Sequence, residues 1–475
     1  MNRDFEDINR ILSLFPVVDG STDNDLYVLE KICEQTEDSY RLDKYDYFQS
    51  HLNECISWMN GKSTSVIDLC RQSQCSKCHI NKWCNHYRNN LQKNEENATG
   101  PVYADFFCGA GGLSWGFHRA GYRMSLANDI QECCIDTIAL NHPEVPGKHI
   151  ISADINDVID NIENISRYKN VDVVVGGPPC QGFSMANRQR LIDDPRNHLY
   201  KSFIKAIAVL TPQFFVMENV RGMLAAKKQI EEDFEAVGYT ATAHLLNAKN
   251  FGVPQNRERV IFIGNRLGID NEEIFRSIFD IGRQRKSYVL SDAIDGLASL
   301  SAKTKANATE LEDEKSGYTF SINGNCFAND YIKSINEGRT PLVTFNHKAR
   351  YNNARDIEIF GRLDPGDNSA DPKIADIMPY KRREKIFKDK YFKLEPDKPC
   401  KTITAHMKFD CNMYIHPSQA RGLTPREAAR IQSYPDDYFF RGSYTKTYMQ
   451  VGNSVPPLLS EAIATAIKNK LEEVH

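Results

Sequence analysis

At 475 residues, the chain exceeds the size at which a single hydrophobic core usually stops growing, which predicts two or three domains. Hydrophobic residues make up 41% of the chain and charged residues 26%, and no apolar run is long enough to cross a bilayer as a helix, so we expect a soluble protein. The 13 cysteines are too dilute for a disulfide scaffold, and the net charge of −4 argues neither for nor against nucleic acid.

Residues 1–95 differ from the rest of the chain. They begin without the basic start and apolar centre of a secretory signal, and the dilute cysteines of the whole chain lead us to expect a reducing compartment. Helical segments rich in aromatic and acidic residues lead to a cluster of cysteines and then to the polar run RNNLQKNEENATG, which we interpret as a linker. The sequence therefore predicts a helical N-terminal extension.

A second region, residues 102–267, repeats short apolar runs that are each followed by a glycine or an acid and then by a helical period. The runs are VYADFFCGAGG, MSLANDI, HIISADI, VDVVVGGPP, PQFFVMENV and RVIFIGN. This alternation predicts an α/β fold with a doubly wound, mostly parallel sheet. Residues 268–400 lose the pattern and suggest a smaller domain, whereas residues 401–475 contain a helix start at Thr424 to Glu427 and a final helix from about Pro457.

Glycines and acids at the ends of the first three predicted strands point to a bound ligand. Gly109, Gly111 and Gly112 let a ligand approach the backbone, although Ser114 stands where the dinucleotide fingerprint has its third glycine. A plain tight turn is the alternative. Asp129 and Asp154 end the next two strands, where such folds hold ribose hydroxyls. Together, these strand ends predict a nucleoside-type cofactor across the carboxyl edge of the sheet.

A single thiol, Cys180, follows the fourth strand in the stretch VDVVVGGPPCQGFS. Prolines fix the backbone and glycines permit close approach, which suits a nucleophile, although a buried structural cysteine is the alternative. Glu218 ends another strand and can face the same site as a partner that accepts or donates protons. Arg257 and Arg259, in QNRER, add planar cationic donors.

In this order, the motifs resemble the DNA (cytosine-5) methyltransferase family. The resemblance rests on DFFCGAGG, GGPPCQGFS, ENV, QNRER, RGLTPREAARIQSYPDDY and QVGNSVPP, and it spans residues 103–470 except for 268–400. It implies the S-adenosylmethionine-dependent methyltransferase fold, with residues 401–475 completing the catalytic domain and 268–400 forming a target-recognition domain. Thr402, in KTITAHMKFD, would be a candidate DNA contact.

The same resemblance implies a reaction at an extruded base. The Cys180 thiolate would add to C6 of cytosine, Glu218 would contact N3 and the exocyclic amine, and Arg259 would hold O2. Arg257 would support the loop. The segment after Cys180 would close over the DNA, with three candidate phosphate contacts in Arg188, Arg190 and Arg196.

For S-adenosyl-L-methionine, the resemblance implies a set of contacts drawn from four motifs. Asp129 would bind the ribose, Asp154 the adenine amine, and Ile130 would lie against the adenine face. The family often has glutamate and an aromatic residue at the positions of Asp129 and Ile130. The remaining implied cofactor residues are Phe107, Gly109 and Gly111, which cradle the cofactor, and Asn453 and Ser454, which close the site.

The N-terminal cysteines are not explained by that family. Cys70, Cys75, Cys78 and Cys84 are separated by four, two and five residues, a pattern typical of a metal site. The segment resembles the iron–sulfur loop of endonuclease III-like DNA glycosylases, with a first gap that is two residues shorter. Four thiolates could hold a 4Fe–4S cluster or one zinc ion, and His79 and His86 keep mixed zinc ligation open. We expect a structural role.

The sequence thus predicts a site-specific DNA (cytosine-5-)-methyltransferase of a prokaryotic restriction–modification system, acting in the cytoplasm. The expected partners are double-stranded DNA and a cognate restriction endonuclease, with no membrane contact and a monomeric chain. Three alternatives are disfavoured. The transfer-RNA branch of the family has a cysteine-phenylalanine-threonine element that is missing here, amino-directed methyltransferases lack a cysteine after Pro-Pro, and a DNA-binding regulator would not need Cys180, Glu218 and Arg259 together.

Overall fold

A computed structural model describes residues 97–474, except for 143, 163–166, 168–169, 180–198, 307–311, 323–328, 339–342 and 380–389. The predicted N-terminal extension lies outside the described residues. All six predicted apolar runs form strands, and a seventh strand joins them in one sheet of order β3-β2-β1-β4-β5-β8-β6. In that order, the strands are Ile150–Ser152, Arg123–Asp129, Val102–Phe106, Val173–Gly176, Phe214–Val220, Glu258–Asn265 and Thr240–Asn247.

The sheet is mostly parallel, which confirms the predicted fold class. Strands β3, β2, β1, β4 and β5 run in the same direction, while β8 is antiparallel to both of its neighbours, β5 and β6. Every residue of β1 and β4 is buried, because helices cover both faces of the sheet. Strand β6 was not predicted, since most of its residues are half-buried or exposed at the edge of the sheet.

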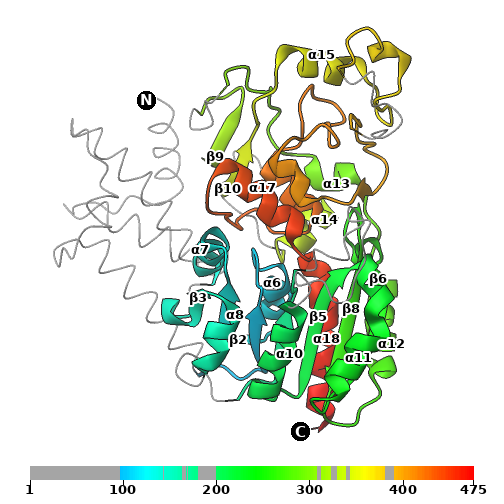
Figure 1. The fold of residues 1–475 in the computed structure, drawn as a ribbon. Coiled ribbons are helices and arrows are strands. Elements are labelled where there is room, and N and C mark those ends of the chain that lie inside the picture. Colours follow the sequence, from blue (N-terminus) through cyan, green and yellow to red (C-terminus); the bar gives the residue numbers. More distant parts are fainter. Residues whose placement is uncertain are drawn as a thin grey trace, which may run out of the picture.

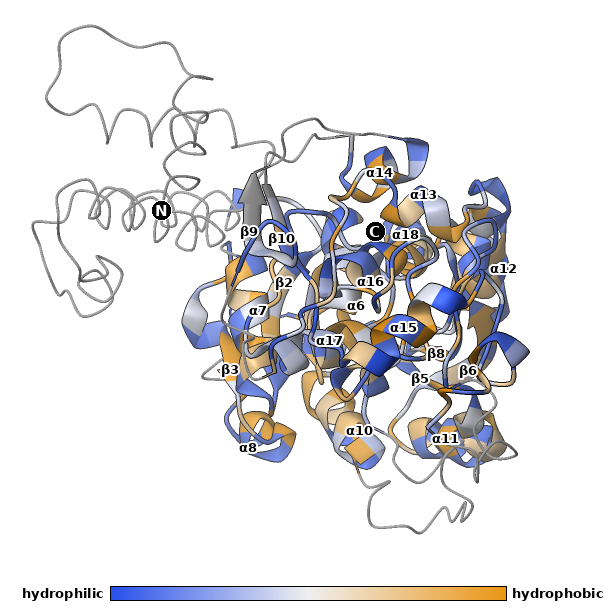
Figure 2. Cartoon of the chain, turned by 90° about the horizontal axis from the view of Figure 1, so that it is seen from above, coloured by the Kyte–Doolittle hydropathy of each residue, from blue (hydrophilic) through white to orange (hydrophobic). Residues whose placement is uncertain are grey.

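Two groups of helices form the outer layers (Figure 1). On one face, a single hydrophobic cluster contains residues of α8 (Ile155–Asp160), α10 (Leu199–Leu210) and α11 (Lys227–Glu235). On the other face, the main cluster includes residues of α6 (Gly112–Arg119), α7 (Glu132–Asn141), α12 (Asn271–Gln284) and α18 (Pro457–Val474). Seen from above, α10, α11 and α12 carry both hydrophobic and hydrophilic residues, as expected for helices between a sheet and solvent (Figure 2).

The C-terminal helix α18 returns to the first helix of the sheet, α6. It begins at Pro457, as predicted, and packs along α6. Gly116 permits this approach, because a Cβ there would lie 2.3 Å from the Cβ of Ser460. Helix α12 opens the interval that the sequence places in a separate domain, yet it packs on β6 and α18. None of the described helices is long and apolar enough to cross a membrane.

Above the carboxyl ends of the strands lies a less regular part (Figure 1). It contains the antiparallel pair β9 (Gly317–Ile322) and β10 (Val343–Lys348), and a small hydrophobic cluster around Ile359 and Phe360. Its helices are α13 (Leu290–Ile294), α14 (Asp330–Ile335), α15 (Ala354–Arg362), α16 (Pro425–Ile431) and α17 (Tyr444–Asn453). The predicted helix start is confirmed, because Thr424 and Glu427 form a capping box at α16.

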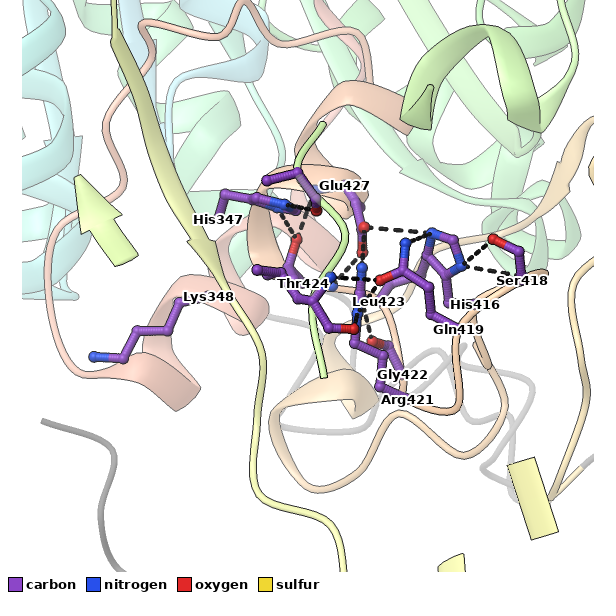
Figure 3. A network of polar contacts seen from close by, with 12 residues as sticks. His347, Lys348, His416, Ser418, Gln419, Arg421, Gly422, Leu423, Thr424 and Glu427 are labelled. Carbon is purple, nitrogen blue, oxygen red and sulfur yellow. Dashed lines mark hydrogen bonds and ion pairs between the residues drawn. The ribbon is translucent and has the colours of Figure 1, made fainter. Parts of the chain in front are cut away.

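A buried polar network joins β10 to the start of α16 (Figure 3). Arg421 binds both carboxylate oxygens of Glu427, at 2.8 and 2.6 Å, and His347 of β10 lies 3.1 Å from the hydroxyl of Thr424. Burial lowers the pKa of His347 and of His416 to about 4, and the neighbouring Arg421 acts in the same direction. Both imidazoles are therefore neutral parts of the packing.

Candidate active site

Glu218 and Arg259 form an ion pair at the carboxyl edge of the sheet. Strands β5 and β8 are antiparallel neighbours, so the end of β5 lies beside the start of β8, and Val220 pairs with Arg259. The Arg259 Nε lies 2.8 Å from the Glu218 Oε1, and both side chains are largely buried. Burial raises the pKa of Glu218, while Arg259 and Arg257 oppose that rise. The site therefore holds a desolvated carboxyl group beside a cation.

The loop that leads to the predicted nucleophile reaches this pair. Gly176 ends β4, and a Cβ on the next residue, Gly177, would lie 3.1 Å from the Glu218 Oε2. Asn219 Nδ2 donates a hydrogen bond of 2.9 Å to the Pro178 carbonyl. Cys180 itself lies outside the described residues, as do Arg188, Arg190 and Arg196. The described chain thus brings the residues just before Cys180 next to Glu218.

Arg257 has different surroundings from Arg259. It is fully buried, and its guanidinium donates to three backbone carbonyls: 2.6 Å to Ile403, 3.1 Å to Gly452 and 2.7 Å to Ser454. Its pKa is lowered, mainly by burial. Arg257 therefore joins QNRER to two distant segments, TITAH (residues 402–406) and VGNSV (residues 451–455).

Thr402 lies on the segment that Arg257 holds. The short strands β11 (Cys400–Lys401) and β7 (Gln255–Asn256) pair in parallel, which sets the two segments side by side. The Thr402 hydroxyl donates 2.7 Å to the Asn256 carbonyl, and the Thr402 residue is half-buried. The predicted DNA contact therefore lies close in the fold to the Glu218–Arg259 pair.

The glycine-rich loop adopts conformations that few residues other than glycine tolerate. Gly109 and Gly111 have φ values of 52° and 76°, and Phe107 has the unusual value of 57°. A Cβ at Gly111 would lie 2.6 Å from the Tyr438 hydroxyl, whereas a Cβ at Gly109 would meet no atom within 4 Å. The loop is thus packed behind Gly111 and open at Gly109, which fits a ligand that approaches the backbone there.

Asp129 holds the glycine-rich loop through its carboxylate. Its Oδ2 accepts from the Gly109 amide at 3.0 Å and its Oδ1 from the Gln131 amide at 2.7 Å. Burial raises the pKa of Asp129, and these backbone amides oppose the rise. The next residue, Ile130, has 66% of its surface exposed. An exposed apolar side chain thus lies next to an oriented carboxylate at the edge of the glycine-rich loop.

The remaining cofactor candidates lie on neighbouring elements. Asp154 is exposed and caps α8 by accepting from the Asn156 amide at 2.9 Å. Asn453 is exposed at the end of α17, whereas Ser454 is buried, and its hydroxyl would lie 2.1 Å from a Cβ at Gly112. The structure therefore brings the C-terminal motif against the glycine-rich loop. These contacts fit S-adenosylmethionine.

A buried acid next to this loop was missed by the sequence analysis. Asp105 accepts a hydrogen bond of 2.5 Å from the Ser114 hydroxyl, and burial raises its pKa to about 8. Its other oxygen, Oδ1, has no hydrogen-bond partner among the described residues. The available signal was an aspartate inside an otherwise apolar strand, VYADF, followed by a serine in place of a glycine.

The predicted metal ligands Cys70, Cys75, Cys78 and Cys84 lie outside the described residues. Within the described part of the chain, one group of side chains has the donor atoms of a metal site: His118, His142 and Glu144, whose donor atoms all lie within 4.8 Å of one another. The Glu144 Oε1 is 2.9 Å from His142 Nδ1 and 3.5 Å from His118 Nδ1. The shorter separation is that of a hydrogen bond, so we interpret this group as a structural cluster.

Comparison with known proteins agrees with this geometry. The sequence model of the C-5 cytosine-specific DNA methylase family matches residues 102–469. The chain is 34% identical to the type II methyltransferase M1.HphI of Haemophilus parahaemolyticus, over 77% of this chain and 86% of the relative. It is also 34% identical to the type II methyltransferase M.DdeI of Desulfomicrobium norvegicum, over 78% of this chain and 89% of the relative.

Among solved structures, a DNA modification methyltransferase encoded within a prophage (E. coli) is similar, with a TM-score of 0.60 and 25% identity. The similarity covers 78% of this chain and 100% of that one. The family resemblance, the fold class and the enzyme class predicted from the motifs are confirmed. The chain belongs to the C-5 cytosine-specific DNA methylase family, whose members use S-adenosylmethionine as methyl donor.

Proposed function

We propose that this enzyme methylates cytosine at C5 within a specific sequence of duplex DNA, through a covalent bond between Cys180 and C6. The observation that carries the proposal is the Glu218–Arg259 ion pair, 2.8 Å long, beside the Gly-Gly-Pro-Pro loop that leads to Cys180. A cytosine ring offers N3 and an amine to a carboxyl group, and O2 to a guanidinium. The paired side chains are thus complementary to one edge of the base.

Glu218 would activate the ring. As the Cys180 thiolate bonds to C6, the electron pair of the C5–C6 double bond moves through C4 toward N3, where the carboxyl group of Glu218 donates a proton. The raised pKa of Glu218 favours the protonated form that this step requires. Arg259 would hold O2, so that the base enters in one orientation. The product of this step is an enamine with a nucleophilic C5.

The donor S-adenosylmethionine, when bound, supplies an electrophilic methyl group to C5. Asp129 would hold its ribose, Ile130 would cover its adenine, and Asp154 would accept from the adenine amine. The remaining contacts would come from Phe107, Gly109, Gly111, Asn453 and Ser454. A base then takes the proton from C5, and that electron pair restores the C5–C6 double bond as the Cys180 thiolate leaves, while N3 returns its proton to Glu218.

The target base must leave the double helix for this chemistry. C6 is covered by stacking in a duplex, so the base would be turned out at a cost of a few kcal/mol. The segment after Cys180, with Arg188, Arg190 and Arg196, would close over the phosphates, and Arg257 would fix the elements around the site. Sequence readout would come from residues 268–400.

We further propose that the enzyme protects host DNA in a restriction–modification system, acting as a monomer on the sequence that a cognate endonuclease cuts. The relatives named as type II methyltransferases support this setting. It predicts that DNA methylated by this enzyme resists one endonuclease of the same host.

One experiment tests the central proposal. The protein is incubated with labelled S-adenosylmethionine and either unmethylated duplex DNA or transfer RNA, and methylated cytosines are then located by sequencing. We expect 5-methylcytosine in DNA at one short sequence, none in transfer RNA, and no product with Cys180→Ala. Cys133→Ala is the matched control, because Cys133 is half-buried on α7. Full activity of Cys180→Ala would contradict the proposed mechanism.

A further inference from the structure

Two exposed aromatic residues lie on segments that Arg350 joins, one just after β10 and one just after η6 (Ala405–Lys408). In the described part of the chain, the large exposed hydrophobic residues are Ile130, Val209, Tyr351, Phe409 and Val474. The two aromatic ones, Phe409 at 66% and Tyr351 at 38% exposure, are linked through Arg350. Arg350 precedes Tyr351 and donates a hydrogen bond of 2.8 Å to the Phe409 carbonyl. Arg350 therefore connects the backbone next to Tyr351 with the backbone of Phe409.

The backbone that carries Phe409 is firmly held. Arg350 also donates 2.7 Å to the Met407 carbonyl, and its guanidinium lies 5.7 Å from the Tyr448 ring. The short helix η6 (Ala405–Lys408) packs against α17, where a Cβ at Gly452 would lie 2.2 Å from the Ala405 amide. The exposure of Phe409 is therefore not the result of a loosely attached loop.

This segment is also tied to the candidate active site. Arg257 binds the Ile403 carbonyl, and Arg259 follows Arg257 by two residues on β8. The chain then runs from Thr402, on the Asn256 carbonyl, through η6 to Phe409. The exposed ring is thus presented by the same segment that contacts the start of β8. A large substrate that reaches Arg259 lies within reach of this segment.

An ammonium group and an imidazole lie beside the Phe409 ring. The Lys408 Nζ lies 4.8 Å from the ring centroid, and the His406 ring lies 5.4 Å from it. One acid is nearby, because Asp410 lies 3.9 Å from His406. A solvent-facing aromatic ring next to an ammonium group suits nucleic acid, since bases and sugars pack on the ring and phosphates attract the cation.

We propose that Phe409 and Lys408 form a DNA-contact site, in which the Phe409 ring packs on a base or sugar beside the target cytosine while Lys408 pairs with a phosphate. This inference rests on the proposed function, and it assigns two residues that the sequence motifs do not identify. The two contacts differ in kind. Packing of an aromatic ring is insensitive to salt, whereas pairing with a phosphate releases counterions.

The test is DNA binding by the full-length protein at several salt concentrations. A short fluorescein-labelled duplex carrying the methylated sequence, and a random duplex of equal length, are titrated in the presence of S-adenosylhomocysteine. For Phe409→Ala, we expect Kd to rise about tenfold without a change in its salt dependence. For Lys408→Gln, we expect a smaller rise and a decrease of about one in the slope of log K against log salt.

Controls separate this inference from folding and from the proposed function. Val209→Ala, on α10 with 49% exposure, should bind DNA like the wild type. Cofactor affinity, measured by calorimetry without DNA, should be equal in all variants. If the wild type binds and methylates DNA while Phe409→Ala binds equally well, this inference is overturned and the proposed function stands. A change in sedimentation with unchanged DNA binding would assign the surface to a second copy and also overturn it.

Discussion

Arg257 donates a hydrogen bond of 2.7 Å to the carbonyl of Ser454, a residue 197 positions away in sequence. The same guanidinium binds the Ile403 and Gly452 carbonyls. One buried side chain therefore closes the catalytic domain around the final segment of the chain. Arg259, two residues further along, instead forms an ion pair with Glu218. The two arginines of one motif therefore stabilise different parts of the fold.

Replacing Arg257 should destabilise the protein and disable the cofactor site together. Arg257→Ala leaves three buried carbonyls without their donor, and we expect a loss of about 3–5 kcal/mol in the free energy of unfolding. Arg257→Lys should recover only part of this loss, because one ammonium group cannot match the planar donors. Urea unfolding and calorimetry with S-adenosylhomocysteine measure the two effects. Arg221→Ala, at an exposed ion pair with Glu258, is the control and should change little.

Glu218→Gln should slow methyl transfer without loss of cofactor binding. The amide keeps the shape of the side chain but cannot deliver the carboxyl proton to N3, so we expect kcat to fall about a hundredfold to ten-thousandfold. Because burial raises the pKa of Glu218, the wild-type rate should fall as rising pH removes this proton. Glu258→Gln, the control on the adjacent strand, should keep its activity. Equal rates for Glu218→Gln and the wild type would rule out this role.

Most of the sheet could be predicted because its strands are buried on both faces and read as continuous apolar runs, as in Val173–Gly176. The edge strand β6 could not be predicted in this way, because TATAHLLN mixes exposed and buried positions. The reversed direction of β8 was also unpredictable, since an apolar run such as VIFIG carries no information about strand direction. The direction of β8 follows from its antiparallel pairing with β5 and β6.

The candidate site was predictable to the extent that motifs fix residue types at strand ends. Glu218 and Arg259 were expected to face one site, and the structure places them in contact. The family resemblance gave the two arginines of QNRER different roles, but the partners of Arg257 could not be predicted, because the carbonyls that it binds belong to Ile403, Gly452 and Ser454, far away in sequence. The Asp105–Ser114 pair was missed for the same reason, since its burial depends on packing around α6.

Asp105→Asn should stabilise the enzyme increasingly as pH rises. The pKa of Asp105 is about 8 in the folded chain against an ordinary value of 3.8, so the folded state keeps a proton that the unfolded state loses. This contribution to stability is complete below pH 3.8 and is lost as pH rises toward 8. The uncharged amide removes that dependence. Thermal unfolding measured across this pH range tests the prediction, with Asp157→Asn, at an exposed carboxyl group, as the control. Parallel curves of stability against pH for the wild type and Asp105→Asn would contradict the prediction.

The metal site of Cys70, Cys75, Cys78 and Cys84 stays a prediction. If these thiolates hold a 4Fe–4S cluster, the purified protein should absorb visible light, and Cys75→Ser with Cys78→Ser should abolish both the colour and the bound iron. A colourless protein with one zinc per chain would favour the alternative. A preparation that binds neither metal would reject both the iron–sulfur and the zinc interpretation. Cys411→Ala, which removes a buried thiol distant in sequence, is the control.

The neutral histidines beside Glu427 should make the enzyme sensitive to acid (Figure 3). His416 Nδ1 accepts from the Ser418 amide at 3.2 Å, and protonation would remove this acceptor next to Arg421. The pKa of His347 and of His416 is about 4 in the folded chain and 6.5 ordinarily, so the unfolded state takes up protons first as pH falls. Stability is therefore complete above pH 6.5 and decreases as pH falls toward 4.

The variant His416→Gln isolates this effect, because its amide keeps one acceptor and one donor but does not titrate. Its free energy of unfolding should fall less steeply than that of the wild type between pH 6.5 and 4.5, a window above the range in which the carboxyl group of Glu427 takes up protons. His244→Gln, at a more exposed imidazole paired with Glu272, controls for the replacement of a histidine outside this network. Urea titrations at each pH measure the slopes. If His416→Gln and the wild type lose stability in parallel, the acid sensitivity arises elsewhere in the fold.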